Sequence, residues 1–354
     1  MKIAIDITPL KKDHFLQHRV RGTGFYIESL TKALKEYFPK HTYTFFTRGE
    51  NVSKNVDIVH YPYFEPFFLT LPVRKPFPTV VTVHDLTPLV FPEQFPTGLR
   101  GNIRWQVQRF SLGGVLAVIT DSHASKQDLM KYASLSDDKI HVVHLAASST
   151  HFRQLKNKAS VEKIRAKYKL PKRFILYVGD VTWNKNLPRL LAAIKKANLP
   201  LVMVGKALIE KDFDKKNPWN QDLLLTQKLA EGDKRIIRLG FVAADDLVAL
   251  YNAATVFTMP SIYEGFGLPI LEALSCGVPV VTTKGGSLSE VAGDGAVYVD
   301  PFSVESIMDG LKEVYSSKNL QTSLIKKGLR HAKKFSWKKT AQETLAVYEK
   351  ALKA

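Results

Sequence analysis

Short apolar runs rich in Val, Ile and aromatic residues alternate along the chain with segments whose apolar residues recur every three or four positions. This alternation predicts an α/β protein, because parallel strands in such a fold are buried runs joined by amphipathic crossover helices. The runs predicted as strands are 2–7, 42–47, 57–61, 79–85, 116–121 and 141–145, then 173–179, 200–205, 235–240, 255–260 and 278–283. The main helices are predicted at 24–37, 124–132, 187–197 and 268–275, and residues 303–354 are predicted to be helical.

A polar stretch of small residues, AASSTHFRQL at 146–155, separates the two series of runs. Residues of this kind suit a linker. We therefore expect a first doubly wound unit at 1–148, a linker at 149–156, a second such unit at 157–335 and a C-terminal helix at 336–354. Sheets of this type bind ligands beyond the carboxyl ends of their strands, and we expect the active site there.

The composition bears on where in the cell the protein is expected to act. The 354 residues include a single cysteine, Cys276, so an internal disulfide is excluded and a cytoplasmic location is expected. The first apolar run is broken by Asp6 and Pro9, unlike a signal peptide, and no window reaches the roughly 18 to 20 apolar residues of a membrane-spanning helix. Any contact with the inner face of a membrane is therefore expected to be peripheral.

The chain is strongly basic, with 51 Lys and Arg against 33 Asp and Glu, a formal net charge of +18. Such a charge attracts polyanions, anionic lipid or phosphorylated substrates without distinguishing them. Nine of the basic residues lie between 153 and 173, where Glu162 is the single acid. We interpret this cluster as a solvated helix face near the linker.

The most informative stretch is PSIYEGFGLPILEALSCGVPVV at 260–281. Glu264 and Glu272 stand eight positions apart, with two glycines and Pro269 between them. Proline suits the first turn of a helix, so a glycine loop is predicted to run directly into a helix N-terminus. Backbone N–H groups there bind phosphate or sugar oxygens, and the two carboxylates can accept hydrogen bonds from hydroxyls of one ligand.

This stretch resembles the E-x7-E signature of the retaining glycosyltransferase family 4, whose GT-B fold has two facing Rossmann-like domains. The resemblance implies that the C-terminal helix packs back on the first domain. Six further segments resemble the same family: 21–34, 79–95, 120–129, 177–187, 239–261 and 285–301.

The resemblance assigns roles to the residues of the signature. Glu264 would lie beside the anomeric carbon of the transferred sugar, and Glu272 would bind the ribose hydroxyls. The backbone amides that would face the sugar hydroxyls and the diphosphate belong to Gly265, Phe266, Gly267 and Leu268.

Lys185 resembles the family lysine that contacts the diphosphate of the donor. A cation there would stabilise the charge that grows on the leaving group, so neither a metal ion nor another cofactor is expected. The family's arginine directly after Gly179 is absent, because Asp180 stands there, and Lys206 is proposed as a substitute. The pair Asp212 and Asp214 lies in a charged run and is predicted to be surface rather than a metal site.

His84 ends a predicted strand, and by the resemblance it contacts the donor sugar as a third catalytic residue beside Glu264 and Lys185. The alternative is a hydrogen-bonded packing residue. Asp85 is expected to fix the following loop. The backbone of Gly22, Thr23 and Gly24 is predicted to approach the donor phosphate or the acceptor from a glycine loop. Ile27 occupies the position of the third glycine of a dinucleotide fingerprint, which disfavours NAD binding.

We therefore expect retaining transfer of a hexose from a nucleotide-diphosphate sugar to a hydroxyl of a glycan or lipid-linked acceptor. GDP-mannose is the first candidate donor by resemblance, followed by UDP-glucose and UDP-N-acetylglucosamine. The alternatives are a nucleotide-sugar epimerase, which leaves the E-x7-E stretch unexplained, and a nucleic-acid-binding protein, whose usual motifs the sequence lacks.

Two basic and apolar stretches are candidates for contact with an anionic membrane. One is Phe64–Pro76, which contains Phe67 and Leu71, and the other is a predicted helix that carries Arg100, Arg104, Trp105 and Arg109. The alternative is a covered loop and a helix that faces the core.

Overall fold

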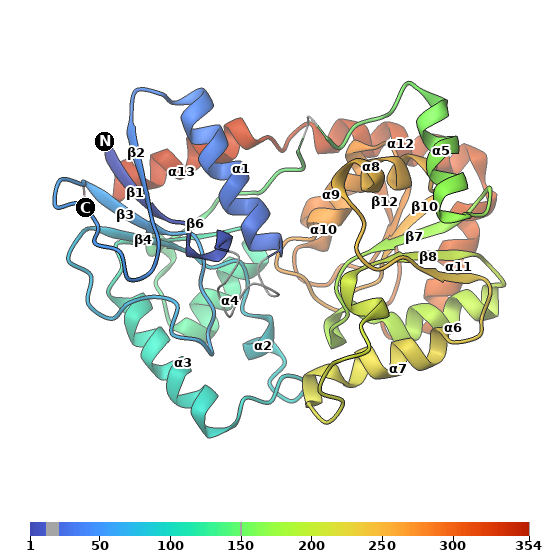
Figure 1. The fold of residues 1–354 in the computed structure, drawn as a ribbon, viewed down its shortest axis with the longest axis horizontal. Helices are drawn as coiled ribbons and strands as arrows, with labels where there is room; N and C mark the ends of the chain where they lie inside the picture. The colour runs from blue at the N-terminus through green and yellow to red at the C-terminus, as the bar shows by residue number, and fades with distance from the viewer. Residues whose placement is uncertain (12–20, 149–150, 354) are drawn as a thin grey trace. The chain divides into compact units, whose positions relative to one another are not determined.

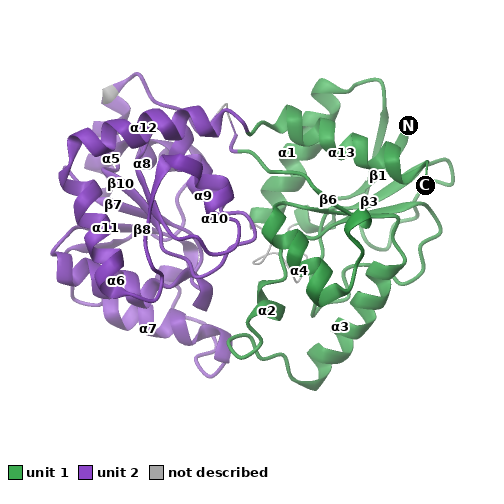
Figure 2. Cartoon of the chain, turned by 180° about the vertical axis from the view of Figure 1, so that it is seen from behind, with its two compact units in different colours: residues 1–146, 335–354 green, residues 147–334 purple. Residues whose placement is uncertain are grey.

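The computed structural model describes residues 1–11, 21–148 and 151–353. The chain divides into two compact units, unit 1 with residues 1–146 and 335–354 and unit 2 with residues 147–334 (Figure 2). Each unit contains one six-stranded parallel sheet flanked by helices (Figure 1). The predicted α/β class is therefore confirmed. No helix within the described ranges is both long and apolar enough to cross a membrane.

The sheet of unit 1 has the strand order β2-β1-β3-β4-β5-β6. Its strands are β1 Lys2–Asp6, β2 Thr42–Phe46, β3 Ile58–Tyr61, β4 Thr79–Thr82, β5 Ala117–Thr120 and β6 Ile140–Val142. Its helices are α1 Arg21–Tyr37, α2 Thr87–Val90, α3 Gly98–Gly113, α4 His123–Ala133 and α13 Trp337–Ala351. All residues of β4 and β5 are buried, which explains their continuous apolar character in the sequence.

The C-terminal helix α13 packs on α1 within unit 1 (Figure 1). The rings of Phe25 and Trp337 meet edge to face with centroids 5.8 Å apart. At the other end of α13, the hydroxyl of the buried Tyr348 lies 2.7 Å from Nδ1 of His60 on β3. The expectation that this helix returns to the first domain is confirmed.

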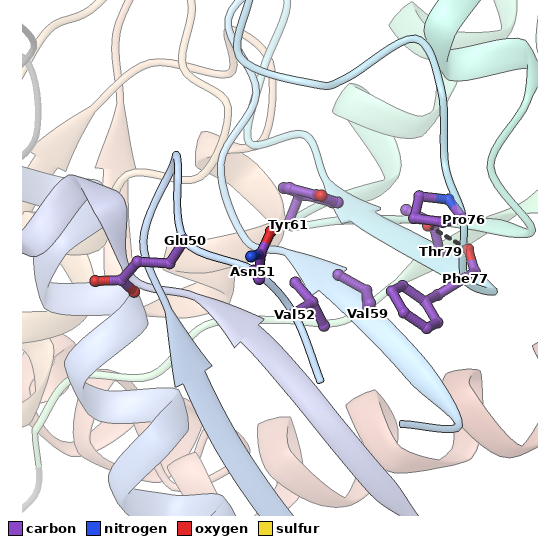
Figure 3. A pocket seen from close by; sticks show the side chains of 8 residues that line it. All are labelled: Glu50, Asn51, Val52, Val59, Tyr61, Pro76, Phe77 and Thr79. Carbon is purple, nitrogen blue, oxygen red and sulfur yellow. Dashed lines mark hydrogen bonds between the residues drawn. The ribbon is translucent and has the colours of Figure 1, made fainter. Parts of the chain in front are cut away.

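A pocket of about 260 Å³ lies on the sheet of unit 1 beside β3 and the start of β4 (Figure 3). Its lining residues are Glu50, Asn51, Val52, Val59, Tyr61, Pro76, Phe77 and Thr79. None of the residues predicted to act on substrate lines this pocket.

The sheet of unit 2 has the strand order β12-β11-β10-β7-β8-β9. Its strands are β7 Ile175–Val178, β8 Leu201–Val204, β9 Ile236–Arg238, β10 Val256–Met259, β11 Val280–Thr282 and β12 Ala296–Tyr298. Its helices are α5 Lys158–Tyr168, α6 Leu187–Ala197, α7 Gln221–Ala230, α8 Ala244–Ala253, α9 Leu268–Ser275, α10 Leu288–Ala292, α11 Val304–Ser316 and α12 Lys318–Ala332. The chain runs from β7 to β9 in one direction and continues on the other side of β7 with β10. The topological switch point, where such sheets bind ligands, therefore lies between β7 and β10.

Some local expectations differ from the structure. Helix α1 begins at Arg21, so Gly22, Thr23 and Gly24 lie in its first turn and not in a loop before a helix at residue 24. The prediction of a glycine loop there is wrong. Residues 149 and 150 of the predicted linker lie outside the described residues, and Phe152 packs on Tyr251 of α8 with ring centroids 5.7 Å apart.

Candidate active site

The turn that carries Lys185 follows β7 on one side of the switch point. Residues Trp183–Lys185 form a 3-10 turn, and Asn186 has a left-handed backbone, with φ 60°, before α6 begins. The side-chain amide Nδ2 of Asn186 donates to the carbonyl of Pro260 at 3.0 Å, and Nδ2 of Asn184 donates to the carbonyl of Tyr263 at 2.9 Å. These bonds fix the Lys185 turn to the segment that follows β10.

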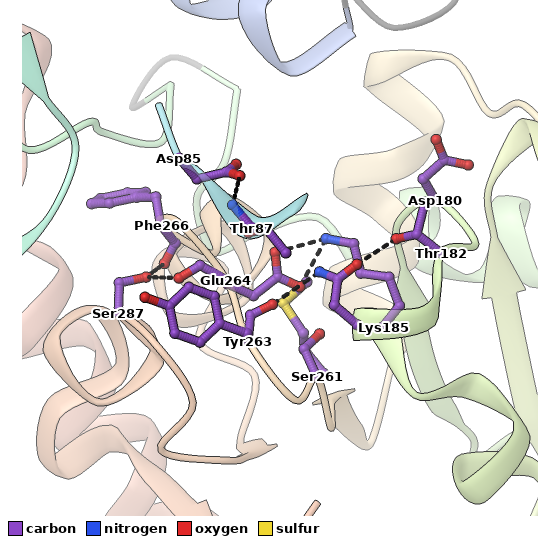
Figure 4. Close-up of polar contacts among 12 residues, drawn as sticks. Asp85, Thr87, Asp180, Thr182, Lys185, Ser261, Tyr263, Glu264, Phe266 and Ser287 are labelled. Atoms are coloured by element: carbon purple, nitrogen blue, oxygen red, sulfur yellow. Dashed lines mark hydrogen bonds and ion pairs between the residues drawn. The ribbon is translucent and has the colours of Figure 1, made fainter. Parts of the chain in front are cut away.

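The same two segments bring Lys185 and Glu264 into direct contact. Nζ of Lys185 lies 2.8 Å and 2.7 Å from the two carboxylate oxygens of Glu264 (Figure 4). The side chains are 19% and 10% exposed, so solvent screens this pair far less than a surface ion pair. The structure thus joins two residues that sequence analysis assigned to separate parts of the donor.

The glycine loop after Glu264 is held by a second loop at 285–287. Oγ of Ser287 lies 2.7 Å from the carbonyl oxygen of Phe266 and 3.1 Å from that of Glu264 (Figure 4). A Cβ on Gly285 would meet the carbonyl oxygen of Ile262 at 1.9 Å, so this close approach of two backbones requires glycine.

Gly267 ends the loop with a φ of 94°, a left-handed conformation that favours glycine, and α9 begins at Leu268. Amides in the first turn of a helix have no acceptor within the helix and carry its positive dipole end. The predicted glycine loop that runs directly into a helix N-terminus is therefore confirmed, and anion binding by its amides stays a prediction.

Glu272 lies one turn into α9 and is buried. The hydroxyl of Tyr251 donates to its Oε2 at 2.8 Å. Burial raises the pKa of Glu272 to about 8, against the opposing effect of the Tyr251 hydrogen bond. With a pKa of about 8, the carboxyl of Glu272 is mostly protonated at neutral pH.

The remaining predicted residues of unit 2 lie at the carboxyl ends of β7 and β8. The amide of Gly179 donates to the carbonyl of Val204 at 3.0 Å, which sets the ends of the two strands side by side. Lys206 is exposed two residues beyond β8, and Asp180 is exposed two residues beyond β7. Asp212 and Asp214 are both exposed, as expected for surface residues.

In unit 1, His84 follows β4 and is held by Asp121, which follows β5. Nδ1 of His84 lies 2.7 Å from Oδ2 of Asp121, and the ring of Tyr26 meets the imidazole edge to face at 4.8 Å. Burial lowers the pKa of His84, but the carboxylates of Asp121 and Asp85 raise it and prevail. Nε2 of His84 is buried, and a backbone contact with Pro62 adds to the rise in the pKa of the ring.

Two other features of this region bear on the sequence predictions. Oδ1 of Asp85 accepts from the amide of Thr87 at 2.9 Å, so the expectation that Asp85 fixes the following loop is confirmed. Asp121 was not singled out, although its position directly after a buried strand is a signal of the same kind as that of His84.

The structure thus places the predicted residues in two groups. Unit 2 contains Gly179, Lys185, Lys206, Glu264, Gly265, Phe266, Gly267, Leu268 and Glu272. Unit 1 contains Gly22, Thr23, Gly24 and His84. Lys185, Glu264 and the start of α9 are joined by contacts across the switch point of unit 2.

Comparison with known proteins assigns this arrangement to a family. Residues 160–331 match the family described as Glycosyl transferases group 1, and residues 9–147 match Glycosyltransferase Family 4. The chain is 32% identical over 281 residues to O-antigen chain mannosyltransferase B of Escherichia coli, a match that covers 76% of this chain and 70% of that protein. The chain belongs to glycosyltransferase family 4. The family that the E-x7-E stretch resembles is therefore confirmed.

This glycosyltransferase is also similar to a second mannosyltransferase in sequence and to a solved structure in fold. It is 27% identical over 288 residues to the serotype-specific mannosyltransferase WbdA of Escherichia coli, and the match covers 79% of this chain but 34% of that longer protein. The crystal structure of Anabaena HepE in complex with UDP-glucose superposes with a TM-score of 0.72 at 16% identity and covers 99% of this chain and 100% of that one. At this identity the likeness shows the fold, and it confirms the predicted GT-B architecture.

Proposed function

We propose that this glycosyltransferase moves mannose from a nucleotide-diphosphate mannose, with GDP-mannose as the first candidate, to a hydroxyl of a glycan or lipid-linked glycan. The mannosyltransferases among its relatives support the sugar. The nucleotide rests on the resemblance of the GDVTWNKN segment to mannosyltransferase members, and UDP-hexoses remain the alternatives.

The observation that carries the proposal is the Lys185–Glu264 pair at the switch point of unit 2. We propose that Lys185 shares its charge between Glu264 and a bound diphosphate, and that the amides at the start of α9 receive phosphate or sugar oxygens. Such fixed charges stabilise a leaving diphosphate without reorganising during the reaction.

The proposed step transfers the sugar with retention of configuration. The bond from the anomeric carbon to the diphosphate oxygen breaks, and the acceptor oxygen bonds to the same face of that carbon. The acceptor proton passes to the departing diphosphate, so a strong protein base is not required. Lys185 stabilises the negative charge on the leaving group, and Glu264 stabilises the positive charge that develops on the sugar ring.

We propose that the ribose hydroxyls donate hydrogen bonds to Glu272. These hydrogen bonds would offset the cost of burying the ionised carboxylate. In unit 1 we propose that Nε2 of His84 hydrogen-bonds a sugar hydroxyl, and that the backbone of Gly22, Thr23 and Gly24 at the start of α1 approaches a phosphate or the acceptor. The proposal includes no metal ion, and Lys185 and Lys206 supply positive charge in its place.

A panel of nucleotide sugars tests the proposal. The purified protein is incubated with GDP-mannose, UDP-glucose and UDP-N-acetylglucosamine, with and without a mannose-terminated acceptor. Transfer or slow hydrolysis of GDP-mannose is expected. If the enzyme turned over a UDP-sugar but not GDP-mannose, the proposal of a GDP-linked donor would be wrong. Formation of an epimer would favour the epimerase alternative, which the family match does not support.

For a lipid-linked acceptor, we also propose that the enzyme acts in the cytoplasm at an anionic membrane surface. The net charge of +18 supports attraction to such a surface.

A further inference from the structure

Helix α3 of unit 1 exposes three large apolar side chains on one face. Leu99 is 77% exposed, Ile103 is 57% exposed and Phe110 is 73% exposed. Their spacing of four and seven residues places them within about 40° of one another around the helix. We call these three residues the α3 stripe. Helix α3 runs along the outside of unit 1 in both views (Figures 1 and 2).

The opposite face of α3 is buried and combines the polar Gln108 and Ser111 with the apolar Trp105 and Leu112. Gln108 is fully buried, accepts from the amide of Leu71 at 3.0 Å and donates to the carbonyl of Leu71 at 3.0 Å. Oγ of Ser111 donates to the carbonyl of Pro72 at 2.7 Å. Trp105, which belongs to the helix named as a candidate membrane contact, is buried on this face, as in the alternative of a helix that faces the core. Helix α3 therefore packs on unit 1 through this mixed face, and the α3 stripe on the other side is exposed.

Arginines border the stripe on both sides. Arg100 and Arg104 are exposed along one edge, and Arg109 lies along the other. Helix α3 contains no acidic residue. Beside it, the segment fixed by Gln108 and Ser111 adds further apolar and basic surface. Its exposed members are Leu69, Val73 and Arg74, whereas Phe67 and Leu71, predicted as contacts, are buried.

We infer that the α3 stripe docks on an anionic lipid bilayer, with its apolar side chains at the headgroup boundary and the bordering arginines on lipid phosphates. An apolar face between cations, without acids, is the pattern of helices that lie in the plane of such a surface. The inference rests on the proposed function for the reason to visit a membrane, namely a lipid-linked acceptor.

Charge favours lipid over a second copy of this chain as the occupant. In a twofold antiparallel pairing of α3 helices, each edge meets its own copy, so Arg100 and Arg104 would face the same arginines. In a parallel pairing they would face Arg109. Like charges would meet in both cases, whereas a phosphate surface neutralises all three residues.

Sedimentation with vesicles tests the apolar half of the inference. The variant combines Leu99→Ser, Ile103→Ser and Phe110→Ser, and the control combines Leu224→Ser and Leu225→Ser, which replace partly exposed apolar residues of α7. With vesicles that contain phosphatidylglycerol, the stripe variant should bind on the order of tenfold more weakly than the wild type, because buried apolar area drives insertion. The control should bind as the wild type does.

The charge half is tested by Arg100→Gln with Arg104→Gln, against Lys326→Gln with Lys327→Gln on α12 as the control. Each arginine near an anionic surface contributes a factor of about five in partitioning, so the double variant should bind about 25-fold more weakly at low salt. The control should change binding much less, and vesicles of phosphatidylcholine alone should retain little of any form.

Each outcome bears on the inference. Equal vesicle binding by the α3 variants and their controls would overturn it, as would a wild type that stays in the supernatant at low salt. A wild-type dimer that the stripe variant dissociates would identify a second copy as the occupant instead. Calorimetry of nucleotide-sugar binding on the same proteins separates the membrane-docking inference from the proposed donor. The affinity for GDP-mannose should be the same in the α3 variants as in the wild type. If GDP-mannose is not the donor, none of the proteins binds it, while their vesicle binding still differs as stated above.

Discussion

The two units each hold one charged pair beyond the ends of buried parallel strands, and the pairs differ in chemistry. In unit 2, Nζ of Lys185 contacts both oxygens of Glu264 at 2.7–2.8 Å, and the partners are 79 residues apart. In unit 1, Nδ1 of His84 contacts Asp121 at 2.7 Å, and the partners are 37 residues apart. An ammonium and a carboxylate are normally charged at neutral pH, whereas an imidazole changes its charge there.

The difference indicates that the two pairs have different roles. The unit 2 pair offers fixed charge at a switch point, which suits stabilisation of a leaving diphosphate. The unit 1 pair offers a titratable ring whose charge depends on Asp121, which suits a role that changes with pH. Variants of each pair should therefore differ in size of effect and in pH dependence.

The largest effect is expected from Glu264→Gln. Gln keeps the shape of the side chain but removes the charge beside Lys185, so turnover should fall on the order of 1000-fold. Turnover with saturating donor and the melting temperature are the measurements. Donor binding should persist, and a folded variant that keeps more than a tenth of wild-type turnover would contradict the role.

Lys185→Ala should reduce turnover about 100-fold, because one charge contact to the leaving group is lost. Lys206→Ala, at the same edge of the sheet, should reduce turnover less than tenfold, because its ammonium is exposed. Chelation with EDTA should leave the wild type active. Strong inhibition by EDTA would instead indicate that a metal ion holds the diphosphate.

The strands and the glycine loop could be predicted because their causes are local. Each buried strand is a continuous apolar run, and Gly267 and Pro269 mark a helix start by their backbone preferences. The contact of Lys185 with Glu264 could not be predicted from spacing, because it depends on β7 and β10 being neighbours in the sheet.

Other elements differ from the sequence predictions for reasons that are equally specific. Gly22 and Gly24 suggested a loop, but helix α1 starts before them, since a helix tolerates glycine in its first turn when its later turns pack well. On α3, Trp105 is buried and not part of an exposed surface, because it shares a face with Gln108 and Ser111, which hydrogen-bond to the segment at 71–72. Strand β12 is a short, half-buried edge strand whose pattern is weak.

A smaller effect, in pH dependence, is expected from Glu272. Its pKa of about 8 means that ionisation must accompany binding if the ribose hydroxyls donate to the carboxylate. Affinity for a nucleotide sugar should therefore rise up to about tenfold per pH unit between pH 6 and 8. Calorimetry in buffers of different ionisation enthalpy should show proton release on binding.

Two variants of this site sharpen the prediction. Glu272→Gln should remove the pH dependence. Tyr251→Phe removes the hydrogen bond that opposes the shift, so the profile should move to higher pH. A wild-type affinity that stays constant from pH 6 to 8 would contradict ionisation of Glu272 on binding.

The smallest effect is expected in unit 1, from Asp121→Asn. Asn can still hold the imidazole but no longer raises its pKa, so turnover at the optimum should fall only a few-fold while the pKa of His84 falls. Because the folded-state pKa of His84 is raised, its contribution to stability is present at low pH and is lost as pH rises through that pKa. The free energy of unfolding should therefore drop more at pH 5 than at pH 9. Titration of the His84 ring by NMR measures the shift directly, and an unchanged His84 titration would show that Asp121 holds the ring without setting its charge.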